Sequence, residues 1–405
     1  MNAWAMGCEI WVLKSTRQRR SRWPIMELSL AKLERDGKLL RKTEIATDVQ
    51  PLSSAVYPMP FGKQEIPGEY AVTVSFLLKE DTEWADAGYE TAFGQGTWTV
   101  EGREEQHMPM PELRISESPW NIGVAGESFE VMFARGSGAL TSYRWGDREM
   151  LKAPVLPNFW RAPTNNDCGN RMPQRYAQWK IASMYAMAGY TGQTRKANAA
   201  MRPVREADGS VTFTAETDLP TNPPAVCRTT YRIHPCGRVD VCLHYDPVEG
   251  LGVMPEFGMI TKLDADYNRV RFYGLGPEEN HIDRRQGARL GIWEYRADEN
   301  LTPYLMPQEC GNRTGIRWAD ITDAKGRGLR LWLNGGEFSA LPWTPHELEN
   351  AAHGFELPPV CYTVLKMSAI QMGVGGDDSW GARTHDEYLP DVSGPMEFRF
   401  SFRGI

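Results

Sequence analysis

The run GVGGDDSW, from Gly373 to Trp380, combines residue types that suit carbohydrate binding. Its glycines give the loop access to positive φ, two carboxylates follow them, and an aromatic side chain closes the run. Because a tryptophan at the end of such a loop is poorly placed for a hydrophobic core, we expect Trp380 to stack on a sugar ring. Asp377 and Asp378 could contact a cation, although solvation or backbone capping is the favoured role.

Two other runs hold many polar side chains between glycine and proline turns: FYGLGPEENHIDR, from Phe272 to Arg284, and YLMPQECGNRTGIRW, from Tyr304 to Trp318. Such side chains can bind sugar hydroxyls, or they can tie loops together through ion pairs and amide bonds. The second role is favoured, because a loop-rich protein must satisfy its buried backbone groups.

A further run, PNFWRAPTNNDCG from Pro157 to Gly169, places Arg161 close to an Asn-Asn-Asp sequence. Asn and Asp favour tight turns because their side chains bond the nearby backbone. A structural corner is therefore the leading interpretation of Asn166 and Asp167.

Hydrolysis of a glycoside requires two facing carboxyl groups, roughly 5–5.5 Å apart for retention or 6.5–9.5 Å for inversion. Glu278 with Glu309, or Asp377 with Asp283, could form such a pair, but spacing in sequence does not fix a distance in space. We do not expect this chain to hydrolyse a glycoside on its own.

Epimerisation of a sugar at its anomeric carbon is a second enzymatic hypothesis, since it needs one general acid and one general base. His281, His353 and His385 lie in loop-like sequence, and Glu279 or Glu309 could act as the base. A single histidine is more often a surface or hydrogen-bonded residue, so this remains the minor alternative.

Alternating β-forming residues predict an all-β protein. Met26 to Leu33, Gly68 to Leu78 and Thr97 to Val100 are expected strands, and Arg35-Asp36-Gly37-Lys38 is an expected turn. Residues 24–101 fit a small immunoglobulin-like β-sandwich. Residues 1–23 are rich in arginine and lack clear alternation, so two interpretations stay open: a truncated start that partly replaces a strand, or a frayed basic terminus.

Residues 102–117 are polar and rich in proline, as expected of a linker. Residues 118–405 alternate strand-like runs with turns and predict a large antiparallel β-sandwich. The expected strands are FEVMF, GSVTFTAET, RVDVCLHY, GLRLWLNG and MEFRFSFRG. Gln174 to Met187 is the one segment that we expect to be helical.

Composition limits the partners of the 405-residue chain. A formal net charge of −7 gives no general attraction for nucleic acid. The mean hydropathy of −0.48 and the absence of a long apolar run argue against a membrane span. No metal-ligand pattern and no signal peptide is visible in the sequence, so a cytoplasmic location is favoured unless a longer parent chain carried a signal.

The ordered set FWRAPTNND, GLGPEENHIDR, PQECGNRTGIRW and GGDDSWGARTHDEY resembles the fifth, small-chain domain of glycoside hydrolase family two β-galactosidases. The similarity runs from about Phe129 to Phe402, and residues 24–101 resemble the family's fourth domain, an immunoglobulin-like sandwich. Two positions depart from the family: His281 stands where tyrosine is usual, and Cys310 replaces a small polar residue.

The resemblance implies a galactose-mutarotase-like β-supersandwich that sends one tryptophan, by motif Trp380, into the active site of a preceding (β/α)₈ barrel. That barrel carries the catalytic glutamates and can bind Mg²⁺ or Na⁺, or Ca²⁺ in some members, so no catalytic residue and no cofactor is expected in this chain. The residues expected to support the site or its loops are Arg161, Asn166, Asp167, Glu279, Asn280, Asp283, Arg284, Glu309, Asn312, Arg313, Asp377 and Asp378.

We therefore expect the C-terminal portion or the small subunit of an enzyme that hydrolyses terminal β-galactosides such as lactose with retention. The expected partners are a galactoside and a large subunit or missing N-terminal barrel portion, and an oligomer is a further possibility. The unusual first 23 residues favour a fragment of a longer gene over a natural subunit. The alternatives are a free-standing mutarotase-like or carbohydrate-binding protein and a purely structural module.

Overall fold

The computed structural model describes residues 2–6, 10–14, 27–47, 54–102, 111–186, 193–378 and 380–405. Antiparallel strands dominate these residues, which confirms the predicted all-β class. The chain divides into two compact units: one comprises Met1–His107 with Arg289–Ile292, and the other comprises Met108–Ala288 with Trp293–Ile405.

The first unit contains a four-stranded antiparallel sheet in the order β4-β3-β6-β7. Its strands are β3 (Glu27–Arg35), β4 (Lys38–Ile45), β6 (Gly68–Leu78) and β7 (Glu90–Val100). The predicted strands Gly68 to Leu78 and Thr97 to Val100 fall within β6 and β7, and Met26 to Leu33 falls within β3 except for Met26, which lies outside the described residues. Asp36 and Gly37, with φ of 51° and 74°, form the tight turn between β3 and β4, as the sequence predicted. Apolar side chains such as Leu33, Val72 and Phe76 form a buried cluster.

A second sheet of this unit has the order β1-β2-β5, with β1 at Asn2–Met6, β2 at Ile10–Lys14 and β5 at Ser54–Pro58. The irregular start expected for residues 1–23 is thus corrected for the residues of β1 and β2. Ile, Trp, Val and Leu in β2 favour an extended strand, and β5 supplies its hydrogen-bonding partner. Residues 15–23 lie outside the described residues.

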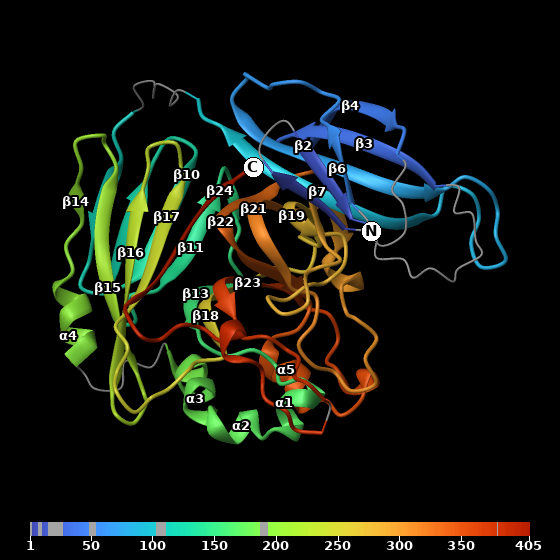
Figure 1. Ribbon diagram of the computed structural model, residues 1–405. Coiled ribbons are helices and arrows are strands. Elements are labelled where there is room, and N and C mark those ends of the chain that lie inside the picture. Colours follow the sequence, from blue (N-terminus) through green and yellow to red (C-terminus); the bar gives the residue numbers. More distant parts are fainter. Residues whose placement is uncertain are drawn as a thin grey trace. The chain divides into compact units, whose positions relative to one another are not determined.

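The strands of the second unit form one continuous antiparallel sheet that curls and closes on itself, so that two layers of it face each other (Figure 1). Side chains of β10 (Phe129–Ala134) meet those of β15 (Val211–Leu219) and β16 (Ala225–Ile233), since the Phe133 ring centroid lies 4.6 Å from that of Phe213 and 4.8 Å from that of Tyr231. Further strands of this region are β8 (Arg114–Glu117), β9 (Asn121–Ala125), β11 (Leu140–Trp145), β12 (Arg148–Glu149), β13 (Ala153–Asn158) and β14 (Val204–Arg205). The end of the expected linker is thus a strand, because β8 pairs with β9.

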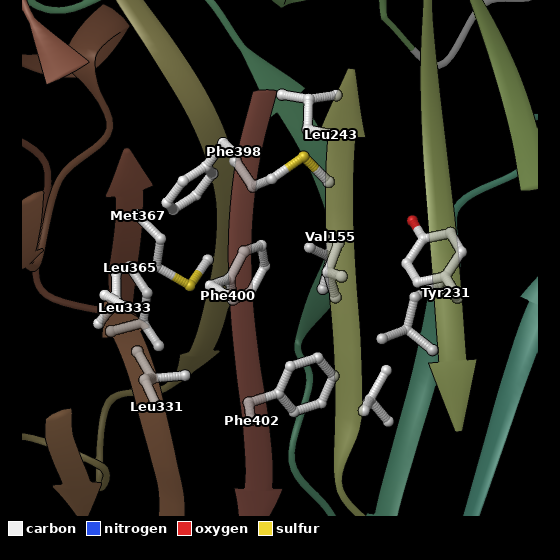
Figure 2. Close-up of a cluster of buried hydrophobic side chains, with 14 of the residues drawn as sticks. Val155, Tyr231, Leu243, Leu331, Leu333, Leu365, Met367, Phe398, Phe400 and Phe402 are labelled. Carbon is white, nitrogen blue, oxygen red and sulfur yellow. The ribbon is translucent and has the colours of Figure 1, made fainter. Parts of the chain in front are cut away.

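Strand β24 (Met396–Gly404) pairs with β17 (Val239–Tyr245) on one side and with β22 (Gly328–Leu341) on the other. It thereby joins the strands that precede β17 to those around β22. Its alternate residues Phe398, Phe400 and Phe402 point to the same side and pack among Leu331, Leu333, Leu365 and Met367 (Figure 2). The remaining strands are β18 (Glu256–Asp264), β19 (Arg269–Gly276), β21 (Arg313–Thr322) and β23 (Tyr362–Gln371). Strand β20 (Arg289–Arg296) is shared, since Arg289–Ile292 belongs to the first unit.

Helices are short and more numerous than the sequence suggested. The expected helix corresponds to α2 (Met172–Arg175) and α3 (Ala177–Tyr185). The structure adds α1 (Asn165–Gly169), α4 (Gln193–Ala200) and α5 (Pro345–Asn350), and the expectation of a single helix is wrong. Capping boxes that begin with a threonine stabilise the starts of α1 and α5. Both helices are too short for a helical spacing of apolar residues to be visible in the sequence. Over the described residues, none of the helices has the length and apolar character needed to cross a bilayer.

We expect Phe133→Ala to lower the free energy of unfolding by about 3–5 kcal/mol, because the removed ring leaves a cavity between the two layers. Chemical denaturation followed by circular dichroism measures this loss. Met132→Ala is the matched control, since the neighbouring side chain is 36% exposed and a surface substitution should change stability by less than about 0.5 kcal/mol. Equal losses in the two variants would contradict the facing arrangement of the layers.

Candidate functional site

The polar runs singled out in the sequence come together at one place in the second unit. The amide of Ala162 donates to the Glu309 carboxylate at 3.2 Å, and the amide of Asn280 donates to the carbonyl of Asn312 at 2.9 Å. The Gly375 amide donates to Asp283 at 2.7 Å. These bonds connect the runs that begin at Pro157, Phe272, Tyr304 and Gly373, which the sequence presented as separate clusters.

Arg161 lies at the base of this region with no exposed surface. Its guanidinium donates to both oxygens of Asp167, at 2.6 and 3.3 Å, and to the carbonyl of Gly373 at 3.1 Å. Asp167 also closes the capping box of α1, where the Thr164 hydroxyl accepts from its amide. One buried ion pair therefore fixes α1 and the first residue of the glycine-rich loop together.

Glu279 anchors the turn after β19. Its carboxylate accepts from the Thr302 hydroxyl and the Gly311 amide, both at 2.7 Å, and also from Tyr304 and Arg284. Burial alone would raise the pKa of Glu279, but these hydrogen bonds lower it to about 2. Glu279 is therefore ionised across the ordinary pH range and acts as a loop anchor.

Asn280, Asn312 and Arg313 also bond to the protein itself. Asn280 donates to the carbonyls of Leu275 and Glu278 and accepts from the amide and the hydroxyl of Thr314. The Asn312 amide group donates to the carbonyl of Asn280 at 3.2 Å. Arg313 donates to the carbonyl of Pro277 at 2.9 Å and lies over the Tyr295 ring. These partners agree with the structural role favoured from the sequence.

Beneath these loops lies a buried charge cluster that the sequence reasoning missed. The ammonium of Lys366 lies 2.6 Å from Glu309 and 3.2 Å from Glu256, and all three side chains are buried. Burial disfavours the Lys366 cation, but the charges of Glu256 and Glu309 outweigh this effect and raise its pKa. Burial raises the pKa of Glu256. A lysine within the apolar run of β23, and a glutamate at the start of the apolar β18, were the available sequence signals.

Glu337, on β22, is a second buried carboxyl group absent from the sequence predictions. It is 5% exposed and accepts from the Asn312 side chain at 2.8 Å. Burial raises its pKa to about 8, with Glu256 acting in the same direction. Glu337 is thus mostly protonated at neutral pH, which removes one negative charge from the cluster.

The loop that begins at Gly373 presents Trp380 to solvent with its side chain 90% exposed. Asp378 accepts from the amide of Trp380 at 2.8 Å and from that of Ala382 at 3.2 Å, so its role is backbone capping. Asp377 lies 2.8 Å from His385, and both are exposed. The Trp380 backbone is therefore held while its indole ring stays free of the core.

The glycines of this loop are needed for a different reason from the one expected. Gly373, Gly375 and Gly376 do not adopt positive φ, whereas Gly381 does, with φ of 123°. A Cβ atom at Gly373 would lie 2.6 Å from the Asp283 carboxylate, and one at Gly376 would lie 2.7 Å from the carbonyl of Ala382. Close packing, and not backbone freedom, explains these glycines.

A cavity of about 160 Å³ lies between the runs. Its lining residues are Thr164, Asn165, Asn166, His281, Arg284, Tyr304, Gln308, Glu309 and Val374. Asn166 also donates to the carbonyl of Val374 at 3.4 Å. His281 is 1% exposed, and burial, assisted by Arg161, lowers its pKa to about 3. His353 is placed elsewhere, beside Glu356.

Within the described ranges, no group of three or more His, Cys, Asp or Glu side chains is arranged to hold a metal ion. The arrangement is suited to hydrogen bonding and stacking. The exposed Trp380 ring lies on a loop that hydrogen bonds hold at its start, and the ion pair of Arg161 and Asp167 supports that loop.

We expect the stability of Glu337→Gln to depend less on pH than that of the parent chain. The folded pKa of about 8 exceeds the ordinary glutamate value of 4.5, so between these two pH values unfolding releases a proton and the parent loses stability as pH rises. The variant should therefore be more stable at pH 7 by roughly 3 kcal/mol. Denaturation at several pH values measures the difference. Glu127→Gln, at an exposed position, is the control, and equal pH slopes in all three proteins would contradict the prediction.

Comparison with known proteins gives two family matches. Residues 125–403 match the family described as beta galactosidase small chain, and residues 26–99 match the family described as beta-galactosidase, domain 4. A solved galactose 1-epimerase from Lactobacillus acidophilus covers 70% of this chain and 94% of its own, but at 7% identity and a TM-score of 0.33 it supports no conclusion.

Three curated relatives agree with the family matches. The beta-galactosidase of Halalkalibacterium halodurans is 36% identical over 343 residues, which cover 84% of this chain and 33% of that protein. The Streptococcus thermophilus beta-galactosidase is 34% identical over 375 residues, covering 92% and 35%. The beta-galactosidase small subunit of Latilactobacillus sakei is 31% identical over 300 residues, covering 69% and 94%. The chain thus spans about a third of the first two relatives. It belongs to the beta-galactosidase small-chain family and corresponds to the C-terminal domains of such an enzyme.

Proposed function

We propose that this chain forms one wall of the active site of a β-galactosidase and that it contacts the substrate through Trp380. The observation that carries this proposal is the combination of a 90% exposed indole ring with a backbone amide held by Asp378 at 2.8 Å. A large aromatic side chain on the surface keeps its apolar area in contact with water until a ligand or a partner covers it. Trp380 offers such a surface from a fixed backbone.

The loop that carries Trp380 is also held by hydrogen bonds at its start, several residues before the ring. Arg161 binds the carbonyl of Gly373, Asn166 binds that of Val374, and Asp283 accepts from the amide of Gly375. These contacts fix the start of the loop, so little conformational entropy remains to be lost when a sugar stacks on the ring. Stacking on a pyranose should contribute about 1–2 kcal/mol, by analogy with aromatic pairs.

Hydrolysis itself is assigned to another part of the enzyme. Relatives named beta-galactosidase are about three times as long as the matched region, so the catalytic barrel suggested by the family resemblance would lie in the unmatched part. Here Glu279 binds loop donors and Glu309 binds Lys366, so both carboxylates serve to hold structure. The proposed reaction is hydrolysis of terminal β-galactosides, including lactose, with retention of configuration.

The proposed partner is a barrel-containing polypeptide, supplied as a large subunit or as the rest of a longer chain. A relative named as a small subunit is matched over 94% of its length, which favours assembly from two chains. The substrate would then bind where the barrel meets the Trp380 loop.

Complementation tests this proposal. The 405-residue chain should not hydrolyse nitrophenyl β-galactoside alone, and it should restore hydrolysis when mixed with the unmatched two thirds of the H. halodurans beta-galactosidase. In that mixture, Trp380→Ala should lower kcat/KM by roughly 5- to 30-fold, the equivalent of about 1–2 kcal/mol.

Trp120→Ala is the matched control, because that tryptophan is 78% exposed and lies on the loop before β9. Wild-type kcat/KM in the Trp380→Ala mixture would remove Trp380 from the site. If the chain alone accelerates galactose mutarotation, and His281→Gln or His353→Gln abolishes this, the free-standing mutarotase alternative replaces the proposal.

Asp378 is proposed as a positioning residue, because its carboxylate accepts from the Trp380 amide at 2.8 Å and from the Ala382 amide at 3.2 Å. In the same mixture Asp378→Ala should lower kcat/KM by a smaller factor than Trp380→Ala. The double variant should be no worse than Trp380→Ala alone, since the two residues act through one contact. Full additivity in this double-mutant cycle would contradict the positioning role.

A further inference from the structure

The cavity of about 160 Å³ is separate from the exposed Trp380 ring and has a different chemistry. Trp380 is not among its lining residues. Most of the lining side chains are polar, and they come from three runs widely separated in the sequence. The contents of the cavity therefore have to satisfy hydrogen-bonding groups on several sides.

His281 is the lining side chain with an unsatisfied group. Its imidazole is 1% exposed, and its Nδ1 atom has no hydrogen-bond partner. The lowered pKa of His281 means that the ring is neutral, so one ring nitrogen donates and the other accepts. A buried polar nitrogen without a partner is costly, and a hydroxyl group in the cavity could satisfy it.

The ionic groups at the cavity are already paired. Arg284 binds Glu279 and lies 3.3 Å from the Tyr304 hydroxyl, while Glu309 lies 2.6 Å from Lys366. A free cation or anion would meet a counter-charge that is already neutralised and would lose its hydration. A neutral group that both donates and accepts fits the remaining amide, carboxylate and imidazole atoms better.

The volume sets the size of the ligand. About 160 Å³ corresponds to the liquid volume of roughly five water molecules, and an apolar cavity of roughly 150 Å³ accepts benzene. Glycerol has as many non-hydrogen atoms as benzene and carries three hydroxyl groups. A complete disaccharide would not fit, whereas the hydroxymethyl edge of one sugar would.

We propose that this cavity is a binding site for a small neutral polyol, either free glycerol or the hydroxyl edge of a monosaccharide, recognised by His281, Gln308 and Glu309. Gln308 is 7% exposed and Glu309 is 2% exposed, so both present fixed polar groups. Asn165 and Arg284 are the exposed lining residues, and we place the entrance beside Asn165. The proposal does not depend on the barrel or on Trp380.

Ligand-observed saturation-transfer NMR on the intact 405-residue chain tests the site. Glycerol and methyl β-galactoside are titrated separately, to distinguish a free polyol from a sugar edge, with inorganic phosphate as the anionic comparison. We expect one or both of the hydroxylated ligands to bind with millimolar affinity and phosphate not to compete. Asn165→Tyr should weaken this binding at least tenfold, because the larger side chain covers the entrance.

Asn350→Tyr provides the matched control, since Asn350 is also exposed, ends α5 and is not among the lining residues. This variant should bind like the parent, and thermal denaturation checks that both variants fold. If neither glycerol nor methyl β-galactoside receives saturation from the protein, the proposal is overturned. Equal binding by the parent and Asn165→Tyr, or displacement of the polyol by phosphate, would overturn it as well.

Discussion

A guanidinium with no exposed surface is unfavourable unless its charge and its N–H groups find partners, and Arg161 is in this position. Its partners are the carboxylate of Asp167 and the carbonyl of Gly373. Because the cation cannot reach water, α1 and the glycine-rich loop must both stay against it. The placement of Trp380 follows from this constraint, since the loop departs from the same carbonyl. A single desolvated charge therefore organises two segments that are distant in the sequence.

Most perturbed carboxyl groups in this region hold the protein together. Glu279 gains its low pKa from loop donors, burial raises the pKa of Glu256 beside Lys366, and Glu337 is protonated at neutral pH because it is buried. Perturbed pKa values often mark catalytic groups, but ion-pair networks produce them too. The exposed indole of Trp380 is the contrasting feature, because its surface is presented and not buried. The proposed contact with a substrate rests on this difference between the internal anchors and the exposed ring of Trp380.

Strands with strict alternation could be predicted from the sequence, as β24 and β15 show, because their period of two is local. Helix α1 could not, because the Thr164–Asp167 box and the Arg161 pair define it, and not an apolar period. The polar runs were recognised as candidate site segments, yet their convergence was invisible. Lys366 lies in a strand and acquires its role only when folding brings two glutamates beside it. Gly373 and Gly376 were noticed for backbone freedom, whereas close packing requires them.

The bonds that fix the Trp380 loop also set the order in which the molecule can assemble. Arg161 and Gly373 are 212 positions apart, Asn166 and Val374 are 208 apart, and Asp283 and Gly375 are 92 apart. Closing loops of this length gains nothing until the intervening strands have paired, so such contacts form late in folding. The loop follows Arg161, Asn166 and Asp283 in the sequence, so it can be held only after the strands between these anchors have been made. A correctly held Trp380 would then report that the whole second unit has reached its native state.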